Sequence, residues 1–224
     1  TEIALRECGA NIDSHDERIE LKGGGKLKPR SLRIPGDISS ASFLVAAALA
    51  LPNSELRLVE VGVNPTRSSY LYLLERIGAI VSFGLLKRES GELVADVTVR
   101  SSTMGRIDIP PTAVPSLIDE LPVLAVLGSQ CQGGLHVQGA SELRVKETDR
   151  IAAIVANLER VGISVEEFPD GFSVEGPQII EGGTVSSYGD HRIAMAFAVA
   201  GLLSKFGVRI QDPDCVEVSF PNFF

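Results

Sequence analysis

Tryptophan is absent from the 224-residue sequence, and cysteine is scarce. The three cysteines, Cys8, Cys131 and Cys215, are odd in number and far apart in the chain. The sequence contains no CxxC pair and no Cys/His cluster, which argues against a disulfide framework and against a zinc site. This use of cysteine fits a reducing compartment, so we expect a cytoplasmic protein.

Long apolar runs are also missing. The two longest, ASFLVAAALAL and IAMAFAVAGLL, have 11 residues each, whereas a membrane-spanning helix needs about 20. The opening residues Thr1-Glu2-Ile3 resemble the middle of a helix rather than a signal peptide. We therefore expect no membrane association.

The charge balance is acidic, with a formal net charge of −8. This balance argues against a nucleic-acid-binding surface, although a local basic pocket can still exist. The hydrophobic content of 44% and the charged content of 22% are ordinary for a globular protein with a sizeable core.

One sequence pattern occurs three times in the chain. The segments LRECGANID (5–13), LERIGAIVSF (74–83) and LERVGISVEEF (158–168) each predict the end of an amphipathic helix, then a glycine, then a strand. The glycine is expected to cap the helix in the left-handed region, where a side chain would cost steric strain.

A second set of segments predicts helices that are buried on most sides. Its members are GDISSASFLVAAALAL (36–51), PSLIDELPVLAVLGSQ (115–130) and GDHRIAMAFAVAGLLS (189–204). Strand-like runs lie between the two sets, at residues 31–36, 55–62, 94–100, 106–111, 135–139, 172–176 and 208–212.

The repeating unit is therefore strand, buried helix, strand, amphipathic helix, strand, strand. Residues 31–100 form one copy, residues 106–176 a second, and residues 183–224 the first half of a third. The predicted fold class is α+β, a pseudo-threefold repeat whose third unit is incomplete. Residues 1–22 are expected to be the tail of another globule's last repeat, 23–30 a linker and 31–224 the second globule, so that the chain is a fragment of a longer protein.

Charged residues gather at the predicted helix starts. Acidic residues such as Asp190 are favoured there as caps, but Lys146, Arg150 and Arg192 oppose the positive end of the helix dipole. Such cations destabilise a helix start unless an anion completes the site. An anion-binding site and a solvated charged turn both remain possible for RVKETDR (144–150).

Two carboxylates accompany these cations. Asp119 and Glu147 could act as general acid and base, with pKa values separated by their environments. Alternatively, Asp119 caps its helix and Glu147 pairs with a neighbouring base. For His191 we expect a structural role, in which it orients a neighbouring carboxylate by a hydrogen bond.

Five motifs together resemble one family. They are IPGDISSASFLVAAALAL (34–51), IDELPVLAVLGS (118–129), ELRVKETDRI (142–151), YGDHRIAMAFAVAGL (188–202) and CVEVSFPNFF (215–224). In this order they resemble the C-terminal half of the 5-enolpyruvylshikimate-3-phosphate synthases (3-phosphoshikimate 1-carboxyvinyltransferases). RVKETDR and GDHRIAM are the most specific of these signals.

The resemblance implies a protein of two globules, each an inside-out α/β barrel of three units, that close on the substrates. It implies transfer of the enolpyruvyl group of phosphoenolpyruvate to the 5-hydroxyl of shikimate 3-phosphate, a step of aromatic amino-acid synthesis. The implied partners are these two substrates and the missing N-terminal globule. No metal and no cofactor is implied, the full-length protein is expected to be a monomer, and glyphosate is expected to compete for the phosphoenolpyruvate site.

The resemblance also implies roles for individual residues. Asp119 is expected to contact shikimate 3-phosphate and accept the proton of its hydroxyl, and Glu147 to take part in proton transfer at the methylene carbon. Lys146 is expected to touch both substrates. Arg150 and Arg192 are expected to bind phosphoenolpyruvate, since planar guanidinium groups suit its carboxylate and phosphate.

Two supporting residues and two departures complete this assignment. His191 is expected to position Glu147, with Asp190 beside it. Glu142 stands where some family members carry Asn, and Val218 stands where some carry Lys. We assign no role to either of these two positions.

Two other functions remain as alternatives. The first is an enolpyruvyltransferase that acts on a nucleotide sugar, and the second is a non-catalytic repeat scaffold. On the leading hypothesis the 224-residue chain holds half a site and is inactive alone.

Overall fold

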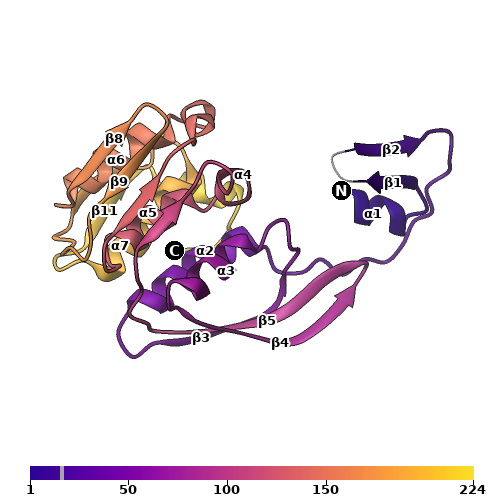
Figure 1. Ribbon diagram of the computed structural model, residues 1–224, viewed down its shortest axis with the longest axis horizontal. Coiled ribbons are helices and arrows are strands. Elements are labelled where there is room, and N and C mark those ends of the chain that lie inside the picture. Colours follow the sequence, from indigo (N-terminus) through magenta and orange to yellow (C-terminus); the bar gives the residue numbers. More distant parts are fainter. Residues whose placement is uncertain (16–17) are drawn as a thin grey trace.

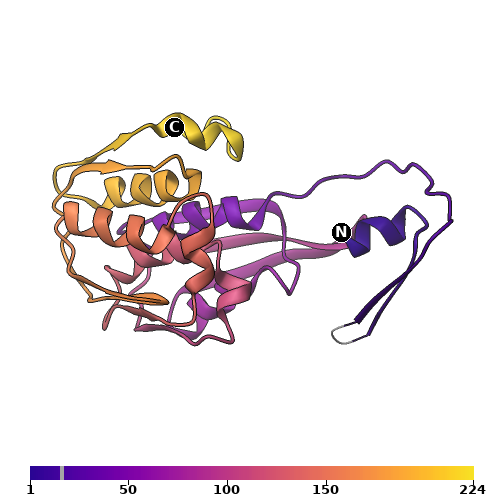
Figure 2. The same cartoon turned by 90° about the horizontal axis from the view of Figure 1, so that it is seen from above.

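The computed structural model describes residues 1–15 and 18–224. A small N-terminal part stands at one side of a larger body (Figure 1). It contains helix α1 (Glu2–Glu7) and the antiparallel strands β1 (Asn11–His15) and β2 (Arg18–Lys22). An extended segment without helix or strand leads from there to the body (Figure 2). The predicted order of helix, strand and strand in residues 1–22 is therefore present.

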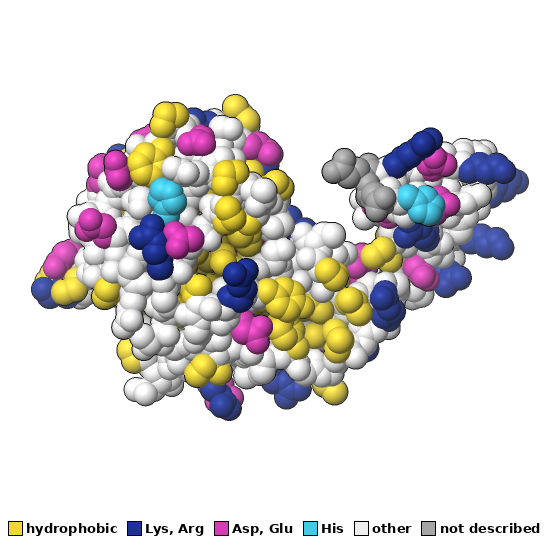
Figure 3. Space-filling model, in the orientation of Figure 1, with side chains coloured by type: hydrophobic (Ala, Val, Ile, Leu, Met, Phe, Trp, Pro, Cys, Tyr) yellow, Lys and Arg dark blue, Asp and Glu magenta, His cyan; other side chains and the backbone are white. Residues whose placement is uncertain are grey.

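The first half of the body is a three-stranded antiparallel sheet with two helices. Helices α2 (Ile38–Ala50) and α3 (Ser69–Arg76) alternate with strands β3 (Glu55–Gly62), β4 (Ile80–Glu89) and β5 (Glu92–Arg100). The strand order is β3-β5-β4. Strand β4 exposes Leu85 and Leu86, and hydrophobic side chains gather over the region of β4 and β5 (Figure 3).

The prediction of a strand at residues 31–36 is wrong. The segment makes only an isolated parallel bridge between Gly36 and Val61. Pro35 has no amide hydrogen to donate to a ladder, and residues 31–34 are exposed at the edge of the sheet. The chain therefore passes along β3 without forming a strand of its own.

The second half of the body repeats the alternation around a four-stranded sheet. Strands β6 (Ile107–Ile109), β7 (Leu135–Val137), β8 (Val165–Phe168) and β9 (Gly171–Val174) have the order β6-β7-β9-β8, in which only β6 and β7 are parallel. The helices are α4 (Val114–Leu117), α5 (Leu121–Gly128), the 3-10 turn η1 (Ser141–Val145) and α6 (Arg150–Arg160).

The last segment adds a parallel strand pair around one helix. Strands β10 (Gly183–Ser186) and β11 (Val208–Gln211) pair on either side of helix α7 (His191–Leu203) in the sequence. The 3-10 turn η2 (Pro213–Val218) follows.

The helix expected across residues 115–130 is split into α4 and α5. Pro122 lies in the first turn of α5, where its nitrogen cannot donate a hydrogen bond to the carbonyl of Ile118. The break leaves Asp119 and Glu120 in a turn between α4 and α5, instead of inside one long helix.

The core is built from the predicted buried helices. α2, α5 and α7 contact one another (Figure 1), and all eight residues of α5 are buried. The predicted glycine caps are confirmed, since Gly9, Gly78 and Gly162 have φ angles of +91°, +104° and +88°. Across residues 1–15 and 18–224, every helix is too short or too polar to cross a membrane.

Leu124 tests the central position of α5. Replacing this residue, which is 1% exposed, by alanine should lower the free energy of unfolding by about 2–5 kcal/mol, because a cavity remains in the core. Leu202→Ala, at an exposed position of α7, should change it by less than about 0.5 kcal/mol. Urea unfolding of both variants measures the difference, and equal losses would contradict a core centred on α5.

Candidate functional site

The starts of α6 and α7 are joined by a buried ion pair. Arg150, the first residue of α6, is 1% exposed, and its Nε donates to Oδ2 of Asp190 at 2.7 Å. Asp190 is the N-cap of α7, where its Oδ1 accepts a hydrogen bond from the backbone nitrogen of Arg192 at 2.8 Å. An aspartate favours this position because it satisfies free amides at the helix start. One carboxylate thus links the two helices.

Three arginine side chains lie close to the carboxylate of Asp119. Its carboxylate lies 3.4 Å from Nη2 of Arg67, 3.6 Å from Nη1 of Arg150 and 3.5 Å from Nη2 of Arg192. Nη1 of Arg192 also donates to the backbone oxygen of Asp119 at 3.1 Å. These arginines come from the turn before α3 and from the starts of α6 and α7. The residues Asp119, Arg67, Arg150 and Arg192 are called the arginine cluster below.

Neighbouring carboxyl groups have opposite pKa shifts in this cluster. Burial of the Asp119 carboxyl opposes its ionisation, but the three guanidinium groups, Arg192 first, outweigh burial and hold its pKa below its usual value. Burial raises the pKa of Glu120, which is 1% exposed and accepts a hydrogen bond from Oγ of Ser39 at 2.6 Å. Asp119 is therefore a carboxylate at neutral pH.

Glu147 and His191 lie at the edge of the arginine cluster. Oε2 of Glu147 accepts from Nη2 of Arg150 at 2.6 Å, and its side chain is about half exposed. Burial, and next the charge of Arg192, lower the pKa of His191, against the opposing charges of Asp190 and Glu147. His191 is therefore a neutral imidazole at neutral pH. In the described part of the chain, no hydrogen bond joins it to Glu147.

Lys146 lies outside the helix whose start it was expected to oppose. The 3-10 turn η1 ends at Val145, and α6 begins only at Arg150, with Asp149 as its N-cap. Nζ of Lys146 pairs with Glu142 at 2.7 Å. The argument from the helix dipole therefore applies to Arg150 but not to Lys146.

Arg144 fixes the loop that carries Lys146 and Glu147. Its guanidinium donates to Asp149 at 2.9 Å and to Glu167 at 2.8 Å, and also to the backbone oxygens of residues 168 and 169. The motif RVKETDR thus contains a structural tether at its first position. The sequence did not separate this role from the others.

Three residues of the site were missed or given no role. Ser39 and Glu120 lie beside predicted helix starts, and Arg67 was not singled out. A signal existed for Arg67: it precedes α3 in the first predicted copy much as Arg150 opens α6 in the second. A comparison of the two copies at that place could have found it.

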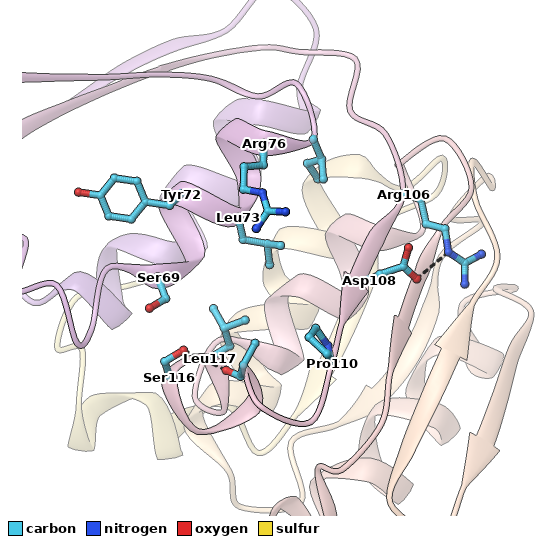
Figure 4. A pocket seen from close by; sticks show the side chains of 11 residues that line it. Ser69, Tyr72, Leu73, Arg76, Arg106, Asp108, Pro110, Ser116 and Leu117 are labelled. Atoms are coloured by element: carbon cyan, nitrogen blue, oxygen red, sulfur yellow. Dashed lines mark hydrogen bonds and ion pairs between the residues drawn. The ribbon is translucent and has the colours of Figure 1, made fainter. Parts of the chain in front are cut away.

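A separate cavity of about 550 Å³ lies between α3 and α4 (Figure 4). Its polar lining includes an ion pair of Arg106 with Asp108 at 2.8 Å. None of the residues of the arginine cluster lines it. Over residues 1–15 and 18–224, no group of three or more His, Cys, Asp or Glu residues is placed to hold a metal ion.

Two solved structures share the fold of this chain. The enolpyruvyl transferase NikO from Streptomyces tendae matches with a TM-score of 0.72 at 18% identity, over 96% of this chain and 48% of that chain, which is a likeness of fold alone. The EPSP synthase from Acinetobacter baumannii matches with a TM-score of 0.91 at 36% identity, over 98% of this chain and 51% of that chain. The fold is therefore the mixed helix and sheet fold of enolpyruvyl transferases.

Sequence comparisons narrow this class to one family. The family model of EPSP synthase (3-phosphoshikimate 1-carboxyvinyltransferase) matches residues 1–224. The chain is 49% identical over 223 residues to the 3-phosphoshikimate 1-carboxyvinyltransferase of Coxiella burnetii (strain RSA 493 / Nine Mile phase I), and 44% identical to that of Alkaliphilus metalliredigens (strain QYMF). The chain belongs to the EPSP synthase family, which confirms the resemblance.

The length of these relatives matters as well. All of this chain aligns with the Coxiella and Alkaliphilus proteins but covers only 51% and 52% of their lengths. The chain thus spans about half the length of the curated relatives it matches.

Asp190 tests the buried ion pair. Asp190→Ala removes a helix cap and the acceptor at the buried Nε of Arg150, which then keeps only its contacts with Glu147 and Asp119, so the free energy of unfolding should fall by about 3–5 kcal/mol. The matched control is Asp37→Ala, which removes the cap of α2 and the hydrogen bond from Oγ of Ser40, and should cost about 0.5–2 kcal/mol. Urea unfolding measures both, and a similar loss in the two variants would show that the ion pair contributes little.

Proposed function

We propose that the protein to which this chain contributes one half transfers the enolpyruvyl group of phosphoenolpyruvate to the 5-hydroxyl of shikimate 3-phosphate and releases phosphate. The observation that carries this proposal is the arginine cluster. In a chain of the EPSP synthase family, three arginines converge on the carboxylate of Asp119, and two of them, Arg150 and Arg192, lie in the motifs that resemble the family.

The same proposal assigns residues 31–224 to one globule with a pseudo-threefold repeat. Two features support it. The bridge from Gly36 to β3 extends the first sheet to the order 36-β3-β5-β4, which corresponds to β6-β7-β9-β8. The parallel pair β10 and β11 also corresponds to β6 and β7, each pair being separated in sequence by a buried helix. Residues 1–22 are then the tail of the first globule, and residues 23–30 the linker.

Asp119 is suited to accept the proton of the substrate hydroxyl. Three guanidinium groups keep it ionised, and its side chain keeps 23% exposure, so that a ligand can reach it. Proton removal raises the nucleophilicity of the hydroxyl oxygen that forms the new bond to the enolpyruvyl carbon.

Arg150 is suited to hold phosphoenolpyruvate. Its Nη1 is buried and has no hydrogen-bond partner among the described residues, a costly state for a charged group. An oxygen of a substrate carboxylate or phosphate would supply the acceptor, and Arg192, which is 16% exposed, borders the same place. Lys146 uses one of its three ammonium hydrogens on Glu142, which leaves the others available to substrate oxygens.

Glu147 is suited to move the proton at the methylene carbon. Protonation of that carbon makes the neighbouring carbon electrophilic toward the hydroxyl oxygen, and later loss of a proton restores the double bond as phosphate leaves. Among the described residues, only Arg150 bonds to this half-exposed carboxylate, so it can turn toward a substrate. His191 and Asp190 would support it, His191 through its position beside Glu147 and Asp190 through Arg150.

The charges of this half-site nearly cancel. The three arginines of the cluster face four acidic side chains, namely Asp119, Glu120, Glu147 and Asp190. Two polyanionic substrates need more positive charge than remains here. In the proposal, that charge comes from the missing N-terminal globule.

The chain by itself should therefore turn over no substrate. Incubation with phosphoenolpyruvate and shikimate 3-phosphate, followed by a phosphate-release assay, should give the rate of a protein-free control. The full-length protein, assayed at the same concentration, should release phosphate only when both substrates are present. Turnover by the isolated chain would mean that the half-site interpretation is wrong.

The two carboxylates can be tested in the full-length protein. Asp119→Asn and Glu147→Gln should each lower kcat by at least about 10², the usual contribution of a positioned acid or base. Both changes preserve size, and unfolding midpoints close to that of the wild type would exclude a folding defect. A rate near that of the wild type for either variant would remove that residue from the proton transfers.

The two alternative functions make different predictions. The family match does not favour a nucleotide-sugar enolpyruvyltransferase. Phosphate release from phosphoenolpyruvate in the presence of such a sugar, but not in the presence of shikimate 3-phosphate, would revive it. A scaffold without catalysis would tolerate Arg192→Ala with no loss beyond stability.

A further inference from the structure

A buried serine connects two charged residues beside Asp119. Oγ of Ser39, in the first turn of α2, lies 2.6 Å from Nη2 of Arg67 and 2.6 Å from Oε1 of Glu120. Ser39 and Glu120 are each 1% exposed. The three residues come from three separate segments, namely α2, the turn before α3 and the start of α5.

The chemistry of these groups fixes the direction of both hydrogen bonds. A guanidinium can only donate, so Oγ of Ser39 must accept from Arg67. The one hydroxyl proton of Ser39 is then available for Glu120, which accepts it. The chain from Arg67 through Ser39 to Glu120 therefore has a single arrangement, which holds the guanidinium at one place.

The same nitrogen of Arg67 also faces the candidate base. Nη2 of Arg67 lies 3.4 Å from Oδ2 of Asp119. Arg150 and Arg192 contact this carboxylate from the starts of α6 and α7, whereas Arg67 approaches it from the turn before α3 and is 40% exposed. Without Ser39, a side chain this exposed could turn into solvent.

We propose that Arg67, locked in place by Ser39 and Glu120, is a positioning residue for Asp119 that fixes its Oδ2 and supplies positive charge beside it. The proposal rests on the proposed function, because it concerns the group that accepts the substrate proton. Arg67 acts through Asp119.

The charges around Asp119 determine in which direction its pKa moves when Arg67 is replaced. The groups that face it are Arg67, Arg150, Arg192 and the adjacent Glu120, and burial opposes the cations. Removal of the positive charge at residue 67 raises the pKa of Asp119. A larger fraction of Asp119 is then protonated at any acidic pH, so the base is lost at a higher pH than in the wild type.

The first test is the pH profile of kcat/KM in the full-length protein, with phosphate release as the measured rate. Arg67→Gln should move the acidic limb of the profile upward by up to about one pH unit, which is the low end of the effect of one nearby opposite charge. Arg67→Lys keeps the positive charge, so its acidic limb should lie close to that of the wild type. Ser39→Ala leaves the charge present but free to turn away, and should give a smaller shift in the same direction.

The matched control is Arg57→Gln. Arg57 is an exposed arginine that pairs with the buried Asp96 at 2.6 Å on the β3–β5 sheet, outside the arginine cluster. Its loss should leave the acidic limb where it is in the wild type. An equal shift in the control and in Arg67→Gln would overturn the proposal, as would an unmoved limb in Arg67→Gln.

A double-mutant cycle separates positioning from a general structural role. At a pH near the acidic limb, Arg67→Gln should lower kcat about tenfold in the wild-type background, and by less than about threefold when Asp119 is already asparagine. Full additivity of the two changes would overturn the proposal. Failure of the proposed function is visible separately, because the unaltered full-length protein would then release no phosphate from the two substrates.

Discussion

The buried ion pair of Arg150 with Asp190 is the contact on which the rest of the candidate site depends. Both side chains are withdrawn from water, with exposures of 1% and 0%. Such burial costs free energy that only close geometry and further hydrogen bonds offset. Asp190 caps α7 with the same carboxylate that binds Arg150. Consequently, a shift of the start of α6 relative to the start of α7 would break this ion pair and leave the buried Nε of Arg150 without its acceptor.

A difference in environment separates two adjacent carboxyl groups. Asp119 and Glu120 are neighbours in the chain, but three arginines surround the first, whereas the second is 1% exposed and accepts a hydrogen bond from Ser39. Charge favours ionisation of Asp119, and burial opposes ionisation of Glu120.

The local features of the fold followed from the sequence because short-range physics determines them. The glycine caps at Gly9, Gly78 and Gly162, the strand at 55–62 and the buried helices at 36–51 and 189–204 agree with the structure, whereas the helix at 115–130 is split before Pro122. The strand expected at 31–36 did not form, because an edge position and Pro35 outweighed the apolar pattern. Long-range contacts were least predictable: Ser39 and Glu120 are 81 positions apart, and nothing local in either segment indicates that they meet.

The contacts of Arg144 restrict the length of the loop that carries Lys146 and Glu147. The guanidinium of Arg144 donates hydrogen bonds to Asp149, which is the N-cap of α6, and to Glu167 in β8. Lys146 and Glu147 project from the span between these fixed ends, and Glu147 must still meet Arg150 three positions later. One inserted or deleted residue between positions 144 and 149 would shift Glu147 off that register while leaving both anchors intact. The position of Glu147 therefore depends on the length of this loop as well as on the identity of its residues.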